Sequence, residues 1–300
     1  MTQIPPHFMG ALVALERPAQ TLPNGELPAE DAEFQAVASG VLIGFPTGTN
    51  NEEGAPLFRI ALFTARHVLE DVDRLWAKFN RGNSAARFLL ELKDGQGNLI
   101  WHTHEDFDVA AIPINHEVLQ AADADYSFVP EYQLFSVATM AQKGVAAGDD
   151  IYVLGFPMGL AGVDRLYAIV RGGTLARVDD EIVRLQKSFF VDCLVFPGNS
   201  GGPVVNRGSL TSVEGTQPST ESGIIGIVSQ YIPYRDVALS AQTGNVRVMF
   251  EENSGLVAVV PVDAMLAAAQ ALLPAPGVPV EASDTVTADE VDVEAPPPAG

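Results

Sequence analysis

The chain is poor in cysteine and in cations, and each shortage excludes a class of protein. Its 300 residues contain one cysteine, Cys193, so no disulfide can form within the chain, and the fold lacks the cross-links that stabilise many secreted proteins. Lys and Arg number 17 against 38 Asp and Glu, which gives a formal net charge of −21, and the cations form no basic cluster. Nucleic acid is therefore not an expected partner, because phosphate binding depends on clustered Lys and Arg.

The sequence also predicts neither a secretory leader nor a membrane-spanning segment. Residues 1–17 do not place a basic start before a long apolar run, as a secretory signal does. The apolar stretch over residues 256–273 is interrupted by Pro261, Asp263 and Gln270, which makes it too short and too polar to span a bilayer. Together with the single thiol, these features predict a cytoplasmic protein that does not bind a membrane.

What the chain does contain is a repeated pattern of short apolar runs. Hydrophobic residues make up 47% of the sequence, and runs of strand length rich in Val, Ile and Phe recur from residue 11 to residue 260. The 27 glycines and 21 prolines fall largely between these runs, where they form turns. The pattern predicts an all-β protein of two β units, with the crossing between them inside residues 115–148.

The end of the chain differs in composition. Residues 262–273 are rich in Ala, Leu and Met after Pro261, which predicts a short C-terminal helix. Residues 274–300 hold six prolines and six acids with no Lys or Arg, so they cannot build a core, and we expect a disordered acidic tail. A solubilising role is the simpler interpretation of this tail, and binding of a protein partner is the alternative.

The strongest local signal for chemistry surrounds Ser200. Glycines at positions 198, 201 and 202 flank this serine between two strand-like runs. Glycine permits the backbone angles and the close substrate approach that an exposed nucleophile needs. The backbone N–H groups of Gly198 and Ser200 are the expected donors to an oxyanion. By itself, however, the run is equally compatible with an ordinary tight turn.

A histidine and an aspartate upstream supply the other two roles of a nucleophilic site. Serine needs a general base within hydrogen-bonding reach, and His67 follows an apolar strand at a loop end. A carboxylate must then orient the imidazole, and Asp108 directly precedes the apolar run 109–114, where an unpaired acid would be costly. The predicted triad is Ser200 as nucleophile, His67 as base and Asp108 as the orienting acid.

The sequence blocks around these residues resemble a known family. They read TARHV at residues 64–68, DVA at 108–110 and GNSGGP at 198–203, and they resemble the signatures of chymotrypsin-clan serine peptidases, above all bacterial trypsin-like and HtrA-related ones. The resemblance implies two antiparallel six-stranded β-barrels over residues 8–125 and 126–261, with the site in the cleft between them. His67 and Asp108 would come from the first barrel and Ser200 from the second, followed by a helix over 262–273 and the tail.

The same resemblance implies where a polypeptide substrate binds. Residues 227–231 resemble the strand that aligns a peptide by backbone hydrogen bonds, with Ser229, Gln230 and Tyr231 against the substrate. The primary specificity pocket would be formed near Leu194, Val195 and Phe196. These residues include no acid, so we expect a preference for an apolar side chain rather than for Arg or Lys.

Some features depart from the family or leave alternatives open. Asn199 stands where cleavage-activated members carry an aspartate that pairs with a new N-terminal amine, so activation by that route is not expected. His102 and His104, with nearby acids, favour a solvated turn over a metal site, and no cofactor is predicted. A catalytically weak or inactive peptidase fold that binds a partner is the alternative function, and esterase activity is a further, incidental one.

Overall fold

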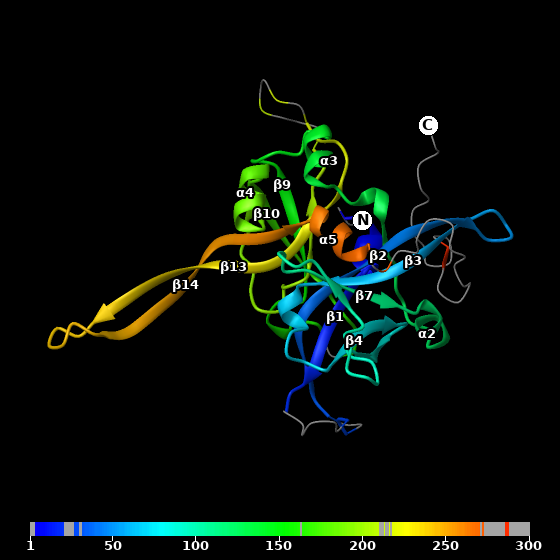
Figure 1. Cartoon of the computed structure of the whole chain (residues 1–300), viewed down its shortest axis with the longest axis horizontal. Coiled ribbons are helices and arrows are strands. Elements are labelled where there is room, and N and C mark those ends of the chain that lie inside the picture. Colours follow the sequence, from blue (N-terminus) through cyan, green and yellow to red (C-terminus); the bar gives the residue numbers. More distant parts are fainter. Residues whose placement is uncertain are drawn as a thin grey trace.

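The regular structure of the protein is mostly β, as the sequence predicts (Figure 1). The computed structural model describes residues 4–20, 27–29, 32–162, 164–209, 213, 216, 218–270, 272 and 286–287. Within these residues the strands form one large sheet from the first half of the chain and one closed barrel from the second half. The cleft that holds the candidate site lies where the two units meet.

The first unit is a sheet with the strand order β5-β4-β1-β2-β3-β7-β6, which β8 joins by pairing with β2 and β15 by pairing with β3. All its pairs are antiparallel except the parallel pair of β2 with β8. The strand bounds are β1 Leu12–Pro18, β2 Phe34–Asn50, β3 Pro56–Thr64, β4 Arg74–Arg81, β5 Ser84–Glu91, β6 His102–Thr103, β7 Ala110–Ile114, β8 Val129–Pro130 and β15 Val286–Thr287.

The second unit is a closed barrel with the order β10-β11-β14-β13-β12-β9. Every neighbouring pair in it is antiparallel. The strand bounds are β9 Asp150–Gly155, β10 Ile169–Arg177, β11 Phe189–Asp192, β12 Pro203–Asn206, β13 Gly223–Leu239 and β14 Val246–Pro261. Closure leaves no free edge around the barrel wall, so each of its strands is hydrogen-bonded on both sides. The loop with Ser200 leads directly into one of these strands, β12, which fixes its position.

Helices are short and lie at the ends of strands. Side chains cap three of them: Asn115 accepts from the N–H of Glu117, Ser136 from that of Thr139 and Asp179 from that of Ile182. The helix bounds are α1 Pro6–Gly10, α2 His116–Ala121, α3 Val137–Gln142, α4 Asp180–Gln186 and α5 Val262–Ala269, with 3-10 turns η1 Arg66–Val68, η2 Glu131–Gln133 and η3 Pro157–Gly159.

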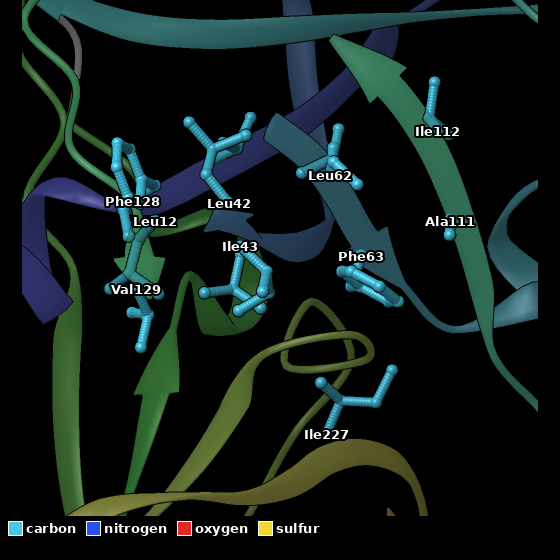
Figure 2. Packing of buried hydrophobic residues seen from close by; sticks show 14 of the residues in the cluster. Leu12, Leu42, Ile43, Leu62, Phe63, Ala111, Ile112, Phe128, Val129 and Ile227 are labelled. Atoms are coloured by element: carbon cyan, nitrogen blue, oxygen red, sulfur yellow. The ribbon is translucent and has the colours of Figure 1, made fainter. Parts of the chain in front are cut away.

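Two buried clusters hold the units together. The larger one fills the first unit and continues into the second, so that Ile227 of the barrel belongs to the same cluster as Phe63 and Ile43 of the sheet (Figure 2). The smaller one fills the barrel and includes the single cysteine, Cys193. Since each fully buried aliphatic or aromatic side chain contributes about 1.5–3 kcal/mol, the shared cluster fixes one unit against the other.

The strands β13 and β14 are far longer than the barrel requires. Their pairing continues from the barrel wall to Leu239 and Val246, and the two strands project from the body as a two-stranded ribbon (Figure 1). The apolar runs at residues 224–229 and 256–260 predict only the part of each strand that lies in the barrel wall. The ribbon was not expected from the sequence.

The family-derived fold is confirmed in its main features, and the structure adds detail. The barrel of the second half closes with six strands, whereas the strands of the first half form an open path, lengthened by β5 and β4 at one edge. The expected helix after Pro261 is present as α5. Of the predicted acidic tail, only Val286 and Thr287 are described, and they pair with Phe58 and Leu57 of β3. No helix among the described residues is long and apolar enough to cross a membrane.

Candidate active site

His67 and Asp108 meet because the strands that carry them are neighbours. Strand β3 ends at Thr64 and β7 begins at Ala110, and these two residues are paired across the sheet. His67 lies just beyond the end of β3, in the 3-10 turn η1, and Asp108 lies just before β7. Antiparallel pairing therefore brings two residues that are distant in sequence to the same end of the β3–β7 strand pair.

The carboxylate of Asp108 forms two hydrogen bonds with His67. His67 Nδ1 lies 2.8 Å from Asp108 Oδ2, and the backbone N–H of His67 donates to Asp108 Oδ1 at 2.9 Å. With Nδ1 donating to the carboxylate, Nε2 carries the free lone pair. The ring is thus held in the tautomer that a general base requires, with its accepting nitrogen directed away from Asp108.

A third residue, Ser229, completes the surroundings of Asp108. Its hydroxyl donates to Asp108 Oδ2 at 2.5 Å. Ser229 stands at a bulge in β13, where the register with β14 shifts between Val228 and Gln230. Since a bulge redirects the side chain of its extra residue, this irregularity lets the second unit contact the carboxylate of the first.

These contacts shift the pKa of both members of the pair. Burial raises the pKa of Asp108, but the hydrogen bonds from His67 and Ser229 outweigh this effect and hold that pKa at about 2. The hydrogen bond to Asp108 raises the pKa of His67 above its ordinary value of 6.5, and partial burial opposes this only in part. Near neutral pH, Asp108 is therefore a stable anion that strengthens the basicity of His67.

Ser200 lies on a turn whose shape depends on glycine. Asn199 N donates to Phe196 O at 3.0 Å, which closes a four-residue turn with Pro197 and Gly198 at its centre. Gly198 has φ of 101°, a value that favours glycine at the third position of a type II turn. The N–H groups of Gly198 and Ser200 make no hydrogen bond within the described residues, so both remain available as donors.

The orientation of the Gly198 N–H is fixed by its own peptide group. Met158 N donates to Pro197 O at 2.6 Å, and in a trans peptide the N–H of Gly198 points opposite to that carbonyl. Met158 adopts a left-handed conformation with φ of 54°, which costs energy for a residue with a side chain. The strained residue of the turn η3, Met158, thus holds the Gly198 N–H in position through its hydrogen bond to Pro197 O.

Ser39, a buried residue of β2 in the first unit, forms hydrogen bonds with the same loop. Its hydroxyl accepts from Phe156 N at 2.9 Å and donates to Gly198 O at 2.7 Å. Its backbone N–H donates to Ser200 O at 2.9 Å. Ser39 therefore binds three residues of the second unit, and these residues lie around the N–H groups of Gly198 and Ser200.

Gly201 lets the two units approach closely beside the nucleophile. A Cβ at this position would lie 2.2 Å from Thr64 Oγ1 and 2.3 Å from Ser39 O, and its φ of 79° is left-handed. Any side chain would push the Ser200 loop away from the strand that leads to His67. The sequence analysis assigned the glycines to backbone freedom, and the structure adds this steric reason.

One cleft collects most of the predicted site residues. It has a volume of about 460 Å³, and its lining includes the following predicted residues: His67, Asp108, Val195, Phe196, Ser200, Ser229, Gln230 and Tyr231. Gly198 lies in the turn directly beside it. Leu194 does not line this cleft: its side chain is exposed and faces a separate hollow with Arg171 and Cys193. The expectation that Leu194 helps to form the specificity pocket is therefore not met in this structure, whereas its neighbours Val195 and Phe196 both line the cleft.

The side chains of Ser200 and His67 are not hydrogen-bonded to each other in this structure. Ser200 Oγ donates to the carbonyl oxygen of Ser229 at 3.2 Å, and the described residues offer it no other hydrogen bond. His67 lines the same cleft as Ser200. The Ser200 hydroxyl must leave the Ser229 carbonyl oxygen before it can donate its proton to His67.

The polar stretch near the site shows no arrangement for a metal ion. In the described part of the chain, no three His, Cys, Asp or Glu side chains gather as metal ligands do. His104 Nδ1 instead accepts from the N–H of Asp106 at 3.1 Å, and its ring lies edge-on against Phe107. Asp106 pairs with Lys187 at 2.9 Å, so this stretch forms a loop held by local polar contacts.

Comparison with known proteins gives a family and a similar solved structure for this chain. A solved structure that resembles this chain is the MamO protease domain from Magnetospirillum magneticum in its apo form, with 14% sequence identity and a TM-score of 0.45 over 87% of this chain and 96% of that chain. Residues 38–210 match the family described as the trypsin-like peptidase domain, and this span contains His67, Asp108 and Ser200. The chain belongs to the trypsin-like peptidase domain family.

Proposed function

We propose that this protein is a serine endopeptidase in which Ser200 is the nucleophile, His67 the general base and Asp108 the residue that orients it. One observation carries the proposal: His67 Nδ1 lies 2.8 Å from the Asp108 carboxylate, and this pair shares one cleft with Ser200. The two unbonded N–H groups of Gly198 and Ser200 supply an oxyanion site beside it. The membership of the trypsin-like peptidase family supports the same reaction.

The proposed reaction proceeds through an acyl-enzyme. Ser200 Oγ forms a bond to the carbonyl carbon of the substrate while His67 Nε2 takes the hydroxyl proton, and the carbonyl oxygen becomes an oxyanion between the N–H groups of Gly198 and Ser200. The C–N bond then breaks, and His67 returns the proton to the leaving amine. Water, deprotonated by His67, attacks the ester carbon, and the proton goes back to Ser200 as the acid product leaves.

An extended peptide would be held along β13 at Ser229–Tyr231. The carbonyl oxygen of Ser229 accepts the Ser200 hydroxyl in the free protein, so it faces the cleft and can accept a substrate N–H instead. Val195 and Phe196 give the wall beside it an apolar character. The Arg171 guanidinium lies 5.2 Å from the centre of the Phe196 ring, which further disfavours a substrate Arg or Lys there.

A second function is favoured by one observation, namely that Ser200 bonds to Ser229 O and not to His67. A protein held permanently in this state would be an inactive peptidase fold that binds a partner in the cleft. The two functions differ in whether Ser200 can react covalently.

Labelling with a fluorophosphonate, which modifies activated serines, tests the proposal directly. We expect stoichiometric labelling of the wild type and cleavage of a denatured protein such as reduced, carboxymethylated lactalbumin. Ser200→Ala should abolish both while leaving the thermal unfolding midpoint unchanged. Ser84→Ala is the matched control, because Ser84 is exposed and, among the described residues, its hydroxyl bonds only to Arg81 O in its turn. A wild-type protein that is neither labelled nor proteolytic would leave the inactive, partner-binding fold as the function.

A further inference from the structure

The two-stranded ribbon described above follows the cleft residues of β13 directly in the sequence, and no further strand of the described part of the chain packs on it. We call residues 232–253 the arm. Strand β12 pairs with β13 only up to Ile227, and β11 pairs with β14 only from Leu256 onward. Beyond these points the described residues provide no third strand, and the arm extends away from the body (Figure 1).

The arm carries apolar side chains on both of its faces. Opposite residues of an antiparallel pair share a face, and faces alternate along each strand. Asp236 is paired with Phe250 and Ala238 with Val248, so Phe250 and Val248 share one face, whereas Val237 and Met249 are paired on the other. The exposed fractions are 53% for Phe250 and 60% for Met249, so these side chains are open to solvent.

Such a ribbon is an unusual feature in a soluble protein. An isolated hairpin is only marginally stable in water, and exposed apolar clusters mark interaction sites. The base of the arm is nevertheless held by polar contacts, since Glu251 accepts from Tyr231 at 2.8 Å and from Arg235 at 2.9 Å. A ribbon stiffened at its base and apolar toward its tip is suited to hold an apolar ligand.

We propose that the arm is an exosite for unfolded polypeptide substrates and contacts apolar side chains on the amino-terminal side of the cleaved bond. The inference rests on the proposed peptidase function and on the continuity of one strand. Strand β13 passes through the cleft at Ser229–Tyr231 and continues without interruption to Leu239. A peptide paired antiparallel with the cleft segment directs its amino-terminal part toward the arm, over roughly 26 Å from Tyr231 to Leu239.

The edge of β13 indicates that side chains, rather than further strand pairing, make this contact. Pro233 has no N–H to donate, and the N–H of Val237 is already bonded to the Asp236 carboxylate at 2.7 Å. These two features also oppose edge-to-edge pairing of two copies along β13, which an open edge would otherwise invite. The structure therefore favours a flexible apolar polypeptide over a second copy of this chain as the occupant.

Peptides of different length test the inference. A bond that the protein cleaves in reduced, carboxymethylated lactalbumin is first mapped, and an octapeptide spanning it is synthesised. Three longer peptides are then made from it. Two carry eight added residues at the amino-terminal end, alternating Val and Thr in one peptide and Gly and Ser in the other. The third carries the Val and Thr segment at the carboxyl-terminal end. We expect the amino-terminal Val and Thr segment alone to raise kcat/KM, by about tenfold, as contact with one or two apolar side chains would.

Substitutions on the arm locate the effect. The double variants Val248→Thr with Phe250→Thr, and Val237→Thr with Met249→Thr, remove the apolar character of one face each while threonine keeps the strand preference. At least one of them should reduce the ratio of kcat/KM for the long and short peptides toward 1. Leu185→Thr is the matched control, because Leu185 is an equally exposed apolar residue on α4 outside the arm, and it should preserve the ratio.

The outcomes separate this inference from the proposed function. The exosite is overturned, and the peptidase function is left intact, if the octapeptide is cleaved but the amino-terminal segment does not raise kcat/KM. The same conclusion follows if both arm variants keep the full increase in kcat/KM. Loss of a dimer in sedimentation of the arm variants, with the peptide ratio unchanged, assigns the arm to a second copy and also overturns it. Absence of both fluorophosphonate labelling and peptide cleavage in the wild type overturns the proposed function itself.

Discussion

Ser200 Oγ is hydrogen-bonded to the carbonyl oxygen of Ser229 at 3.2 Å, and this carbonyl lies on the strand proposed to pair with substrate. A carbonyl oxygen has two lone pairs, but a second donor weakens the first hydrogen bond, so a substrate N–H that binds here loosens the bond from the serine hydroxyl. A peptide that docks against β13 therefore competes with the nucleophile for its resting acceptor. The hydroxyl that it displaces is then free to turn toward His67.

The first prediction follows from this competition. Replacing the substrate N–H that pairs with Ser229 O by an ester oxygen removes the donor that displaces Ser200. We expect this depsipeptide to lower kcat by about tenfold as well as to raise KM, whereas the same replacement at the N–H facing Tyr231 should raise KM alone. Steady-state kinetics of the three peptides provides the measurement, and equal kcat values for all three would contradict the competition.

The second prediction concerns pH. Because the Asp108 carboxylate raises the pKa of His67 above 6.5, kcat/KM should increase with pH through an apparent pKa above 6.5, where the imidazole becomes neutral. Asp108→Asn removes the charge that stabilises the imidazolium, so the acid limb should shift to lower pH while the rate falls by about ten-thousandfold. A pH–rate profile of both proteins is the measurement. An acid limb that stays in place in Asp108→Asn would show that another group controls it.

The third prediction concerns Asn199, which departs from the family pattern. Asn199 is fully buried, its Oδ1 accepts from Phe196 N at 3.1 Å, and its Nδ2 has no partner in the described structure. Asn199→Asp would place a carboxylate there with a single donor, so burial should raise its folded-state pKa above the unfolded value near 4. Stability should then fall as pH rises above about 4, by about 2 kcal/mol or more at neutral pH.

Urea unfolding at pH 5 and pH 8 measures this effect. The deficit of Asn199→Asp relative to wild type should be larger at pH 8. The exposed residue Asn245 at the arm tip gives the control Asn245→Asp, which should change stability little at either pH. A deficit that does not grow with pH would mean that a partner neutralises the new carboxylate.

The proposed triad was predictable from the sequence because each of its residues stands near a strand boundary with a distinctive neighbourhood. His67, Asp108 and Ser200 were identified from local patterns, and the structure brings all of them to one cleft. Ser39 and Met158 were missed, because their contacts to the Ser200 loop join segments distant in sequence and use a common serine and a backbone N–H. No local pattern marks such a contact before the two units are assembled.

The arm was missed for a different physical reason. Strands are recognised in a sequence by the alternation of buried and exposed residues, which a ribbon with no buried face does not produce. Pro233 and the charged residues Arg235 and Glu251 further reduce the signal of a strand. Leu194 shows a different limit of sequence reasoning, because its place beside Val195 suggested a shared pocket, whereas its side chain is exposed and lines a separate hollow.

The fourth prediction uses the position of Ser39 between the two units. Ser39→Ala leaves Phe156 N and Gly198 O without their buried partner, so the free energy of unfolding should fall by about 1–3 kcal/mol. Because Gly198 then loses one of its anchors, its N–H is less well placed for the oxyanion, and kcat should fall with little change in KM. Ser188→Ala is the matched control, since Ser188 is also buried but bonds to Gln186 O, outside the cleft, and should lower stability without changing kcat. If Ser39→Ala keeps the wild-type kcat while losing stability, Ser39 serves only to hold the two units together.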